Sequence, residues 1–126
     1  MPRFLQVTPF LHVADLEAAV AFYTGLFGFQ VFANGGNYAY LQREAVGLRI
    51  MSYKGDDAEL PKGDGRWNVY IDVADVNALY QECKPKLDAL PRGSVEGPLD
   101  QPYGQRELMV KAPDGNVLVF GQALTA

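Results

Sequence analysis

The chain repeats one short pattern in which an alternating strand runs into an amphipathic helix at an aspartate. The first copy, residues 10–23, reads FLHVADLEAAVAFY, and the second, residues 70–83, reads YIDVADVNALYQEC. In both copies Val-Ala-Asp ends the strand, so we expect Asp15 and Asp75 to accept hydrogen bonds from the free N–H groups of the first helical turn. The sequence therefore predicts a fold built from two similar halves. Apolar residues of the two helices recur at the spacing of a face laid against a sheet, namely Leu16, Ala19, Val20 and Tyr23 in the first helix and Val76, Leu79, Tyr80 and Cys83 in the second.

Three further segments in each half have the alternation and flanking turn residues of strands, which predicts a β-α-β-β-β order twice and an α+β fold class. The segment 54–66 has Gly, Pro and mixed charge without periodicity, which is typical of a solvated linker. We therefore expect one domain over residues 1–126, with a first module of about 1–53 and a second of about 67–126. The helices are expected at 16–24 and 76–83, with Pro85 weakening the second, and the strands at 5–13, 29–32, 38–42, 47–53, 67–73, 95–99, 105–112 and 116–122.

The composition excludes several classes of protein. With 126 residues, 48% of them hydrophobic, the chain can bury a core without metal or disulfide staples. Its only cysteine, Cys83, lies on an apolar helix face, which favours a packed core thiol over a reactive nucleophile.

No apolar run approaches the ~20 residues that span a bilayer, and no signal-peptide pattern opens the chain, so we expect a cytoplasmic protein. A net charge of −4 argues against nucleic acid and favours a cationic ligand, unless it serves only solubility.

A single helix covers one face of each predicted sheet and leaves the other face open. Two such sheets side by side form a half-open barrel with the helices outside and a concave ligand cleft within. The aromatic residues on the open faces offer flat surfaces for stacking a heteroaromatic molecule, although each could instead fill the barrel or a dimer interface. By alternation and position, the residues expected to line the cleft are Phe10, His12, Tyr38, Tyr40, Arg49, Met51, Trp67, Asn68, Tyr70, Asp72, Tyr103, Glu107, Met109 and Lys111.

This order of elements resembles the vicinal oxygen chelate superfamily, which includes glyoxalase I, extradiol dioxygenases, fosfomycin resistance proteins and bleomycin resistance proteins. The resemblance covers essentially the whole chain and rests on the two VAD corners, on Phe-Tyr followed by GLFGF at 25–29, and on APDGN at 112–116. Pro9 and the stretch QPYGQRE at 101–107 look most like bleomycin-binding proteins. That likeness implies that an aromatic side chain at Tyr38 contacts the ligand.

Enzymes of this superfamily hold a divalent metal on His and Glu side chains of the first and last strands of each half. Such ligands leave coordination positions open for substrate oxygens. At the matching positions this chain has Thr8, Asn68 and Val119, none of which is a good ligand, and the cationic Arg49 would oppose a metal ion. We therefore expect neither a metal nor another cofactor.

His12 is the only histidine, and we expect it on the open face of the first strand. There it could give a hydrogen bond or a proton to a ligand near neutral pH, and the alternative is a structural, hydrogen-bonded histidine. One histidine without a second ligand or an acidic partner makes neither a metal site nor a catalytic pair. No catalytic residue is therefore assigned, and His12 is the one candidate.

Two functions of different classes are compatible with these features. One is a non-enzymatic protein that binds and sequesters an aromatic or cationic, antibiotic-like molecule, as the resemblance to bleomycin resistance proteins implies. The other is a glyoxalase- or dioxygenase-type lyase, isomerase or oxidoreductase, with a metal at other positions or with His12, Glu107 or Tyr70 transferring a proton. A structural or regulatory domain is a third possibility.

A homodimer is expected because the two modules expose strand edges and an open concave side. The resemblance further implies that an N-terminal arm, residues 1–8, crosses to the partner at Pro9. Neither a nucleic acid nor a membrane is expected as a partner.

Overall fold

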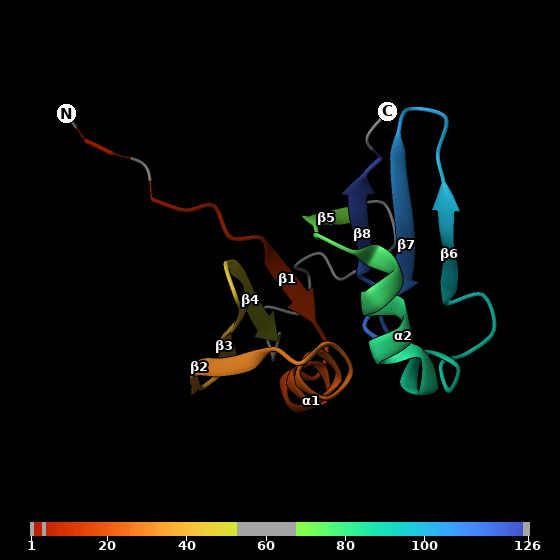
Figure 1. Cartoon of the computed structure of the whole chain (residues 1–126). Coiled ribbons are helices and arrows are strands. Elements are labelled where there is room, and N and C mark those ends of the chain that lie inside the picture. The colour runs from red at the N-terminus through yellow and green to blue at the C-terminus, as the bar shows by residue number, and fades with distance from the viewer. Residues whose placement is uncertain (1, 4, 53–67, 125–126) are drawn as a thin grey trace.

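The computed structural model of the protein describes residues 2–3, 5–52 and 68–124. The expected linker at 54–66 and Trp67 lie outside the described residues. Within the described part, the elements form two four-stranded sheets, each with one helix (Figure 1). We call the elements up to residue 52 module 1 and those from residue 68 module 2.

Both modules have the predicted β-α-β-β-β order. Module 1 consists of β1 (Phe10–Val13), α1 (Leu16–Phe27), β2 (Gln30–Gly35), β3 (Tyr38–Arg43) and β4 (Val46–Ser52). Module 2 consists of β5 (Asn68–Asp72), α2 (Val76–Leu87), β6 (Val95–Asp100), β7 (Gln105–Lys111) and β8 (Val117–Ala123). The strand orders are β1-β4-β3-β2 and β5-β8-β7-β6, with the first strand of each module parallel to the last. The α+β class is confirmed, and the two sheets stay open at their edges rather than closing into a barrel.

The capping aspartates act as the sequence predicts. The backbone N–H of Ala18 donates to Asp15 over 3.1 Å, and that of Ala78 donates to Asp75 over 3.0 Å. α1 runs three residues past its expected end and stops at Gly28, whose φ of 71° is the left-handed conformation that commonly ends a helix.

The second helix also runs past its expected end, and Pro85 lies inside it. A proline removes one backbone hydrogen bond from a helix, but here the following turn is held in other ways. Leu87 is buried in the core, and the N–H of Asp88 donates to the carbonyl of Lys84 over 2.9 Å. The expected end at residue 83 is wrong because burial of the last turn outweighs the local cost of Pro85.

The first strand is shorter than expected. It begins at Phe10, and the preceding segment extends away from the two sheets (Figure 1). Pro9 has no N–H and cannot donate to a strand ladder, which accounts for the start at the next residue. Residues of the expected strand before Phe10 are exposed instead, 94% of Val7 and 83% of Leu5.

Hydrogen bonds at the C-terminal end of α1 connect the two modules. The last carbonyls of a helix lack partners within it. Here the carbonyl of Gly25 accepts from Lys86 Nζ over 2.6 Å, and that of Leu26 accepts from Cys83 Sγ over 3.3 Å. The carbonyl of Phe27 accepts from Arg43 Nη1 over 2.8 Å. Two of these three donors come from α2, so module 2 completes the backbone bonding of a module 1 helix.

Tyr23 makes a second connection between the modules. Its side chain is fully buried on the inner face of α1, and its hydroxyl donates to Asp114 Oδ2 over 3.0 Å. Burial and the charge of Asp114 raise the pKa of Tyr23, and burial raises the pKa of Asp114. Cys83 is buried as expected, and burial raises the pKa of its thiol. Neither helix of the described chain is long and apolar enough to span a bilayer.

Candidate functional site

The open face of the module 1 sheet carries six of the residues expected to line the cleft. Their neighbours on the same strands, such as Leu11, Leu41 and Ile50, point into the core and are buried. The alternation of each strand therefore separates the two sets as predicted. The open-face residues are Phe10 and His12 on β1, Tyr38 and Tyr40 on β3, and Arg49 and Met51 on β4.

The Arg49 side chain contacts several other side chains on this face. Its Nε donates to Thr8 Oγ1 over 2.7 Å, and its Nη1 donates to the hydroxyl of Tyr38. The guanidinium also lies 4.7 Å from the centre of the Tyr40 ring, within cation–π range. The ring of Phe10 is 5.9 Å from the ring of Tyr38. We call Thr8, Phe10, Tyr38, Tyr40 and Arg49 the Arg49 cluster, which presents aromatic surface around one positive charge.

The open face of the module 2 sheet is built around a buried carboxylate. Glu107 on β7 is only 9% exposed. Its Oε2 accepts from the hydroxyl of Tyr70 and its Oε1 from the hydroxyl of Tyr103, each over 2.8 Å. Tyr70 also donates to Gln105 over 3.3 Å. We call these four residues the Glu107 cluster.

The two tyrosines of the Glu107 cluster are hydrogen-bond donors near neutral pH. Burial and the bond to Glu107 raise the pKa of Tyr70 to about 12, and the bond to Glu107 raises the pKa of Tyr103. A phenol with a raised pKa keeps its proton, so neither side chain is suited to act as a general base. Both remain accessible, with 44% of Tyr70 and 66% of Tyr103 exposed.

Gly121 on β8 makes room for the Tyr70 side chain. A Cβ atom at this position would lie 1.9 Å from the Tyr70 hydroxyl oxygen and 2.4 Å from Cζ. Gly121 stands between Asp72 on β5 and Glu107 on β7, so Tyr70 crosses β8 over a position without a side chain to reach Glu107. We did not predict this role from the sequence, although a glycine inside a strand is a known signal of close approach.

The predicted site residues thus fall into two groups, one on each sheet. The second group includes Asn68, Tyr70, Asp72, Glu107, Met109 and Lys111 on the strands and Tyr103 in the turn before β7. Leu108 and Val110 between them are buried, which agrees with the predicted alternation. Whether both groups line one ligand cleft stays a prediction.

The residues at the metal-ligand positions of the superfamily do not suit a divalent ion. The hydroxyl of Thr8 is occupied by the Arg49 guanidinium, and the Val119 side chain is buried and has no donor atom. Throughout the ranges that the structure describes, no three His, Cys, Asp or Glu side chains gather so that they could hold a metal.

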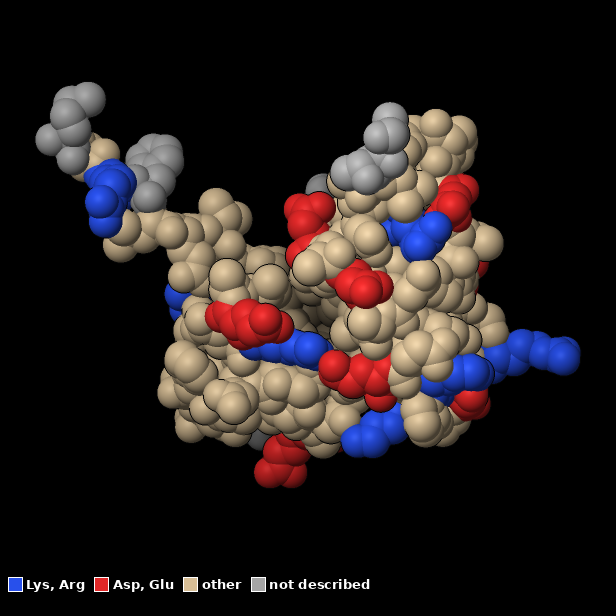
Figure 2. Space-filling view, viewed as in Figure 1, with Lys and Arg blue, Asp and Glu red and all other residues tan. Residues whose placement is uncertain are grey.

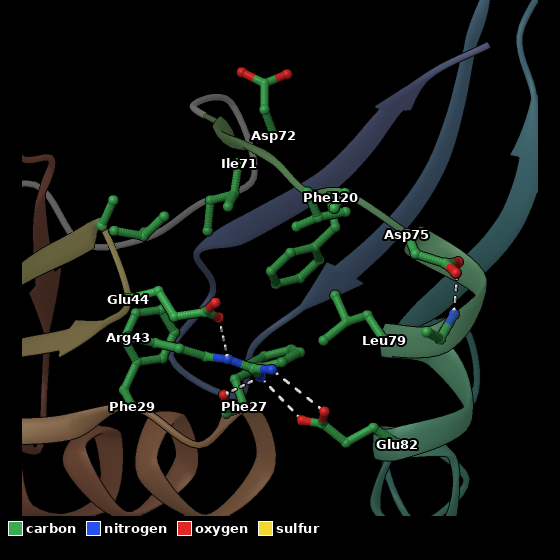
Figure 3. A pocket seen from close by; sticks show the side chains of 15 residues that line it. Phe27, Phe29, Arg43, Glu44, Ile71, Asp72, Asp75, Leu79, Glu82 and Phe120 are labelled. Atoms are coloured by element: carbon green, nitrogen blue, oxygen red, sulfur yellow. Dashed lines mark hydrogen bonds and ion pairs between the residues drawn. The ribbon is translucent and has the colours of Figure 1, made fainter. Parts of the chain in front are cut away.

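A separate pocket of about 350 Å³ lies between the modules on the side of the helices. The space-filling view shows the molecule hollowed between its two halves, with acidic and basic side chains beside the hollow (Figure 2). Phe27, Phe29, Ile71, Leu79 and Phe120 supply apolar walls (Figure 3). None of these residues belongs to the clusters on the open faces.

Arg43 spans this pocket and joins the modules across it (Figure 3). Its Nη1 and Nη2 donate to the two carboxylate oxygens of Glu82 on α2 over 2.9 and 3.3 Å. Its Nε donates to Glu44 over 3.3 Å. These charged bonds raise the pKa of Arg43, with the bond to Glu82 as the largest cause.

Comparisons with known proteins agree with this architecture. A family model of the glyoxalase/bleomycin resistance protein/dioxygenase superfamily matches residues 3–120. A bleomycin-binding protein from Streptomyces verticillus, solved with copper(II)-bleomycin, superposes with a TM-score of 0.73 at 24% identity over 100% of both chains. A bleomycin resistance determinant encoded on transposon Tn5 gives 0.76 at 24% identity, covering 95% of this chain and 98% of that one.

The antibiotic-binding protein TnmS3 from Streptomyces sp. CB03234 gives a TM-score of 0.72 at 23% identity, over 98% of this chain and 99% of that one. No curated protein sequence matches the chain. Identities of this size show a shared fold, and the family model spans nearly the whole chain. The protein therefore belongs to the glyoxalase/bleomycin resistance protein/dioxygenase superfamily.

Proposed function

We propose that the protein binds and sequesters an antibiotic-like small molecule, aromatic and positively charged, without transforming it. The observation that carries this proposal is the buried Glu107 carboxylate, held by Tyr70 and Tyr103 on an open sheet face. A buried carboxylate is stabilised by a positive charge, and the aromatic rings beside it favour a flat or cationic ligand. The antibiotic binding named for two structural neighbours, and the bleomycin resistance named for a third, support an antibiotic-like ligand.

The two clusters would act together on such a ligand. Stacking on an aromatic ring contributes about 0.5–1.5 kcal/mol beyond the burial of area, so several rings can hold a ligand that no single ring could. Tyr38, Tyr70 and Tyr103 would supply these rings, and Asp72 and Glu107 would supply negative charge. Phe10, His12, Tyr40, Met51, Asn68 and Met109 are proposed as further contacts.

The observations on the described residues favour binding over catalysis. Thr8 and Val119 do not suit a metal, and the hydroxyl of Tyr70, with a pKa of about 12, is a poor base. The metal-dependent enzymatic alternative would require metal at about one equivalent per chain in protein purified without chelator. Metal analysis of such protein tests that alternative directly.

We expect Tyr38→Ala and Tyr103→Ala each to weaken ligand binding several-fold, because each removes one stacking surface from an open face. Thermal-shift screening with bleomycin and a panel of aromatic cationic antibiotics would identify a ligand, and calorimetric titration would compare the variants. Both variants should keep most of the wild-type stability. If each instead loses the roughly 3–5 kcal/mol of an emptied core site and leaves affinity unchanged, these residues belong to the core and the proposal fails.

We also propose that the protein is a cytoplasmic homodimer, with residues 1–8 exchanged between the copies. The exposed apolar side chains of Leu5 and Val7 on an extended segment support the exchange. Light scattering at micromolar concentration should give the mass of a dimer, and a monomer would contradict it. Deletion of residues 1–8 should weaken the dimer, whereas an unchanged dimer would contradict only the exchange.

A further inference from the structure

We propose that the pocket between the modules is a second ligand site, which takes a small aromatic molecule carrying one positive charge. The proposal does not depend on the open-face clusters, because the pocket lies on the opposite side of the sheets and shares no residue with the two clusters. Its walls come from both modules: the end of α1 and the β3–β4 turn on one side, and β5, α2 and β8 on the other.

The size and walls of the pocket suit one aromatic ring system. Its volume of about 350 Å³ falls at the small end of the range for small-molecule sites, roughly 300–1,000 Å³. The rings of Phe27 and Phe120 lie 4.9 Å apart at its base, and Ile71 and Leu79 point into it from module 2 (Figure 3). These side chains are already largely buried, with 1% of Phe27, 3% of Phe120, 7% of Ile71 and 9% of Leu79 exposed. A flat apolar ligand would therefore contact only the small apolar surface that they leave open to the pocket.

The charges around the pocket favour a cation. The carboxylates of Glu44 and Glu82 both lie beside the single positive charge of Arg43, which leaves one negative charge in excess. Asp75 belongs to the lining too, but its carboxylate caps α2 and is turned away from the pocket (Figure 3). Asp72 also belongs to the lining, but its carboxylate points away from the pocket (Figure 3). The N–H groups of Arg43 donate to the Phe27 carbonyl, Glu44 and Glu82, so few of them are left for an anionic ligand. A positively charged group at this rim would meet an excess of carboxylates, whereas a carboxylate would be repelled.

Glu44 places one of these carboxylates through an uncommon backbone conformation. Its φ is 52°, in the left-handed region that residues other than glycine seldom adopt. In this turn between β3 and β4 its side chain meets Arg43 at the mouth of the pocket (Figure 3). Asparagine tolerates the same conformation, so Glu44→Asn removes the charge while keeping the turn.

Binding of 2-phenylethylammonium, compared with its neutral analogue 2-phenylethanol, tests the proposal. Chemical shifts of the intact protein, titrated to about 10 mM, would give both affinities. We expect the ammonium compound to bind at least about threefold more tightly, and we expect high salt to reduce this difference because it screens partly exposed charges. Equal affinities, or no binding of either compound, would overturn the proposal.

Three variants locate the bound cation. Ala78→Trp places a large ring at the pocket from an exposed position on α2 and should abolish binding. Glu44→Asn should reduce the preference for the cation without displacing the aromatic ring. Glu107→Gln removes the carboxylate of the open face, so the chemical shifts of the pocket residues should titrate as in the wild type, whatever binds at the open face. If Glu107→Gln abolishes binding while Ala78→Trp and Glu44→Asn do not affect it, the cation binds at the open face and only the proposed function is supported.

Discussion

Replacing Tyr23 with alanine should lower the free energy of unfolding by about 3–5 kcal/mol, the range typical of emptying a core aromatic site. Tyr23 is fully buried, and its ring contacts the ring of Phe22 at a centroid distance of 5.0 Å. The substitution leaves a cavity under α1 and removes the donor of Asp114 on module 2. Urea unfolding followed by circular dichroism would measure the change. A loss below about 1 kcal/mol would contradict this account of the core.

Tyr23→Phe is the matched control, since it keeps the ring and removes only the hydroxyl. Its cost should be about 1 kcal/mol, that of one hydrogen bond at a partly buried carboxylate. The pKa of Asp114 should also rise further in this variant, because the Tyr23 bond lowers it. A carboxyl whose pKa is higher in the folded state than in the unfolded state adds stability at low pH that is lost as pH rises through the folded pKa. Asp114→Asn should remove that dependence.

Substituting Gly121 with alanine should return the pKa of Tyr70 from about 12 towards its ordinary value near 10. The new Cβ would stand 1.9 Å from the Tyr70 hydroxyl oxygen, so the flexible side chain must swing away and give up its bond to Glu107. Absorbance titration of the tyrosines would follow the change, with Tyr70→Phe identifying the Tyr70 signal. The free energy of unfolding should fall by about 1 kcal/mol, the cost of one hydrogen bond lost at a buried carboxylate.

A second comparison tests whether the displaced Tyr70 matters for binding. Gly121→Ala should weaken a ligand of the open face, but it should add nothing in a Tyr70→Ala background, where the ring is already absent. An unchanged pKa of Tyr70 in Gly121→Ala would show that the backbone moves instead of the side chain. Additive losses in the double variant would show that Gly121 acts on the site by a route other than Tyr70.

Local pattern was enough to predict most of this fold. The capping aspartates, Asp15 and Asp75, and the alternation along the strands depend only on nearby residues, and both were predicted correctly. The ends of elements depend on tertiary packing, which the local pattern does not contain. Burial of Leu87 carries α2 past Pro85, and the lack of any packing surface leaves Val7 exposed although it continues an alternating pattern.

The two candidate sites likewise differ in whether the local sequence pattern predicts them. The open-face residues could be assigned by alternation, because side chains on one strand face are two residues apart. The pocket between the modules could not be predicted in this way, because Arg43 and Glu82 meet only after two elements distant in the sequence have packed together. One signal was present: Arg43 shares a strand face with the buried Ala39 and Leu41, an unusual place for a charge. Gly121, a glycine inside a strand, was a comparable signal because it indicates the close approach of another group.

The bonding at the end of α1 bears on how a duplicated chain loses its structure. Two similar halves could in principle melt as separate cooperative units. Here two of the last carbonyls of α1 accept hydrogen bonds from Lys86 and Cys83 of α2. Unfolding of the second half would therefore remove two hydrogen-bond donors from the first helix. The first half therefore lacks two of these hydrogen bonds when the second half is unfolded. Loss of structure in the second half is thereby passed on to the first helix, which couples the unfolding of the two halves of the repeat.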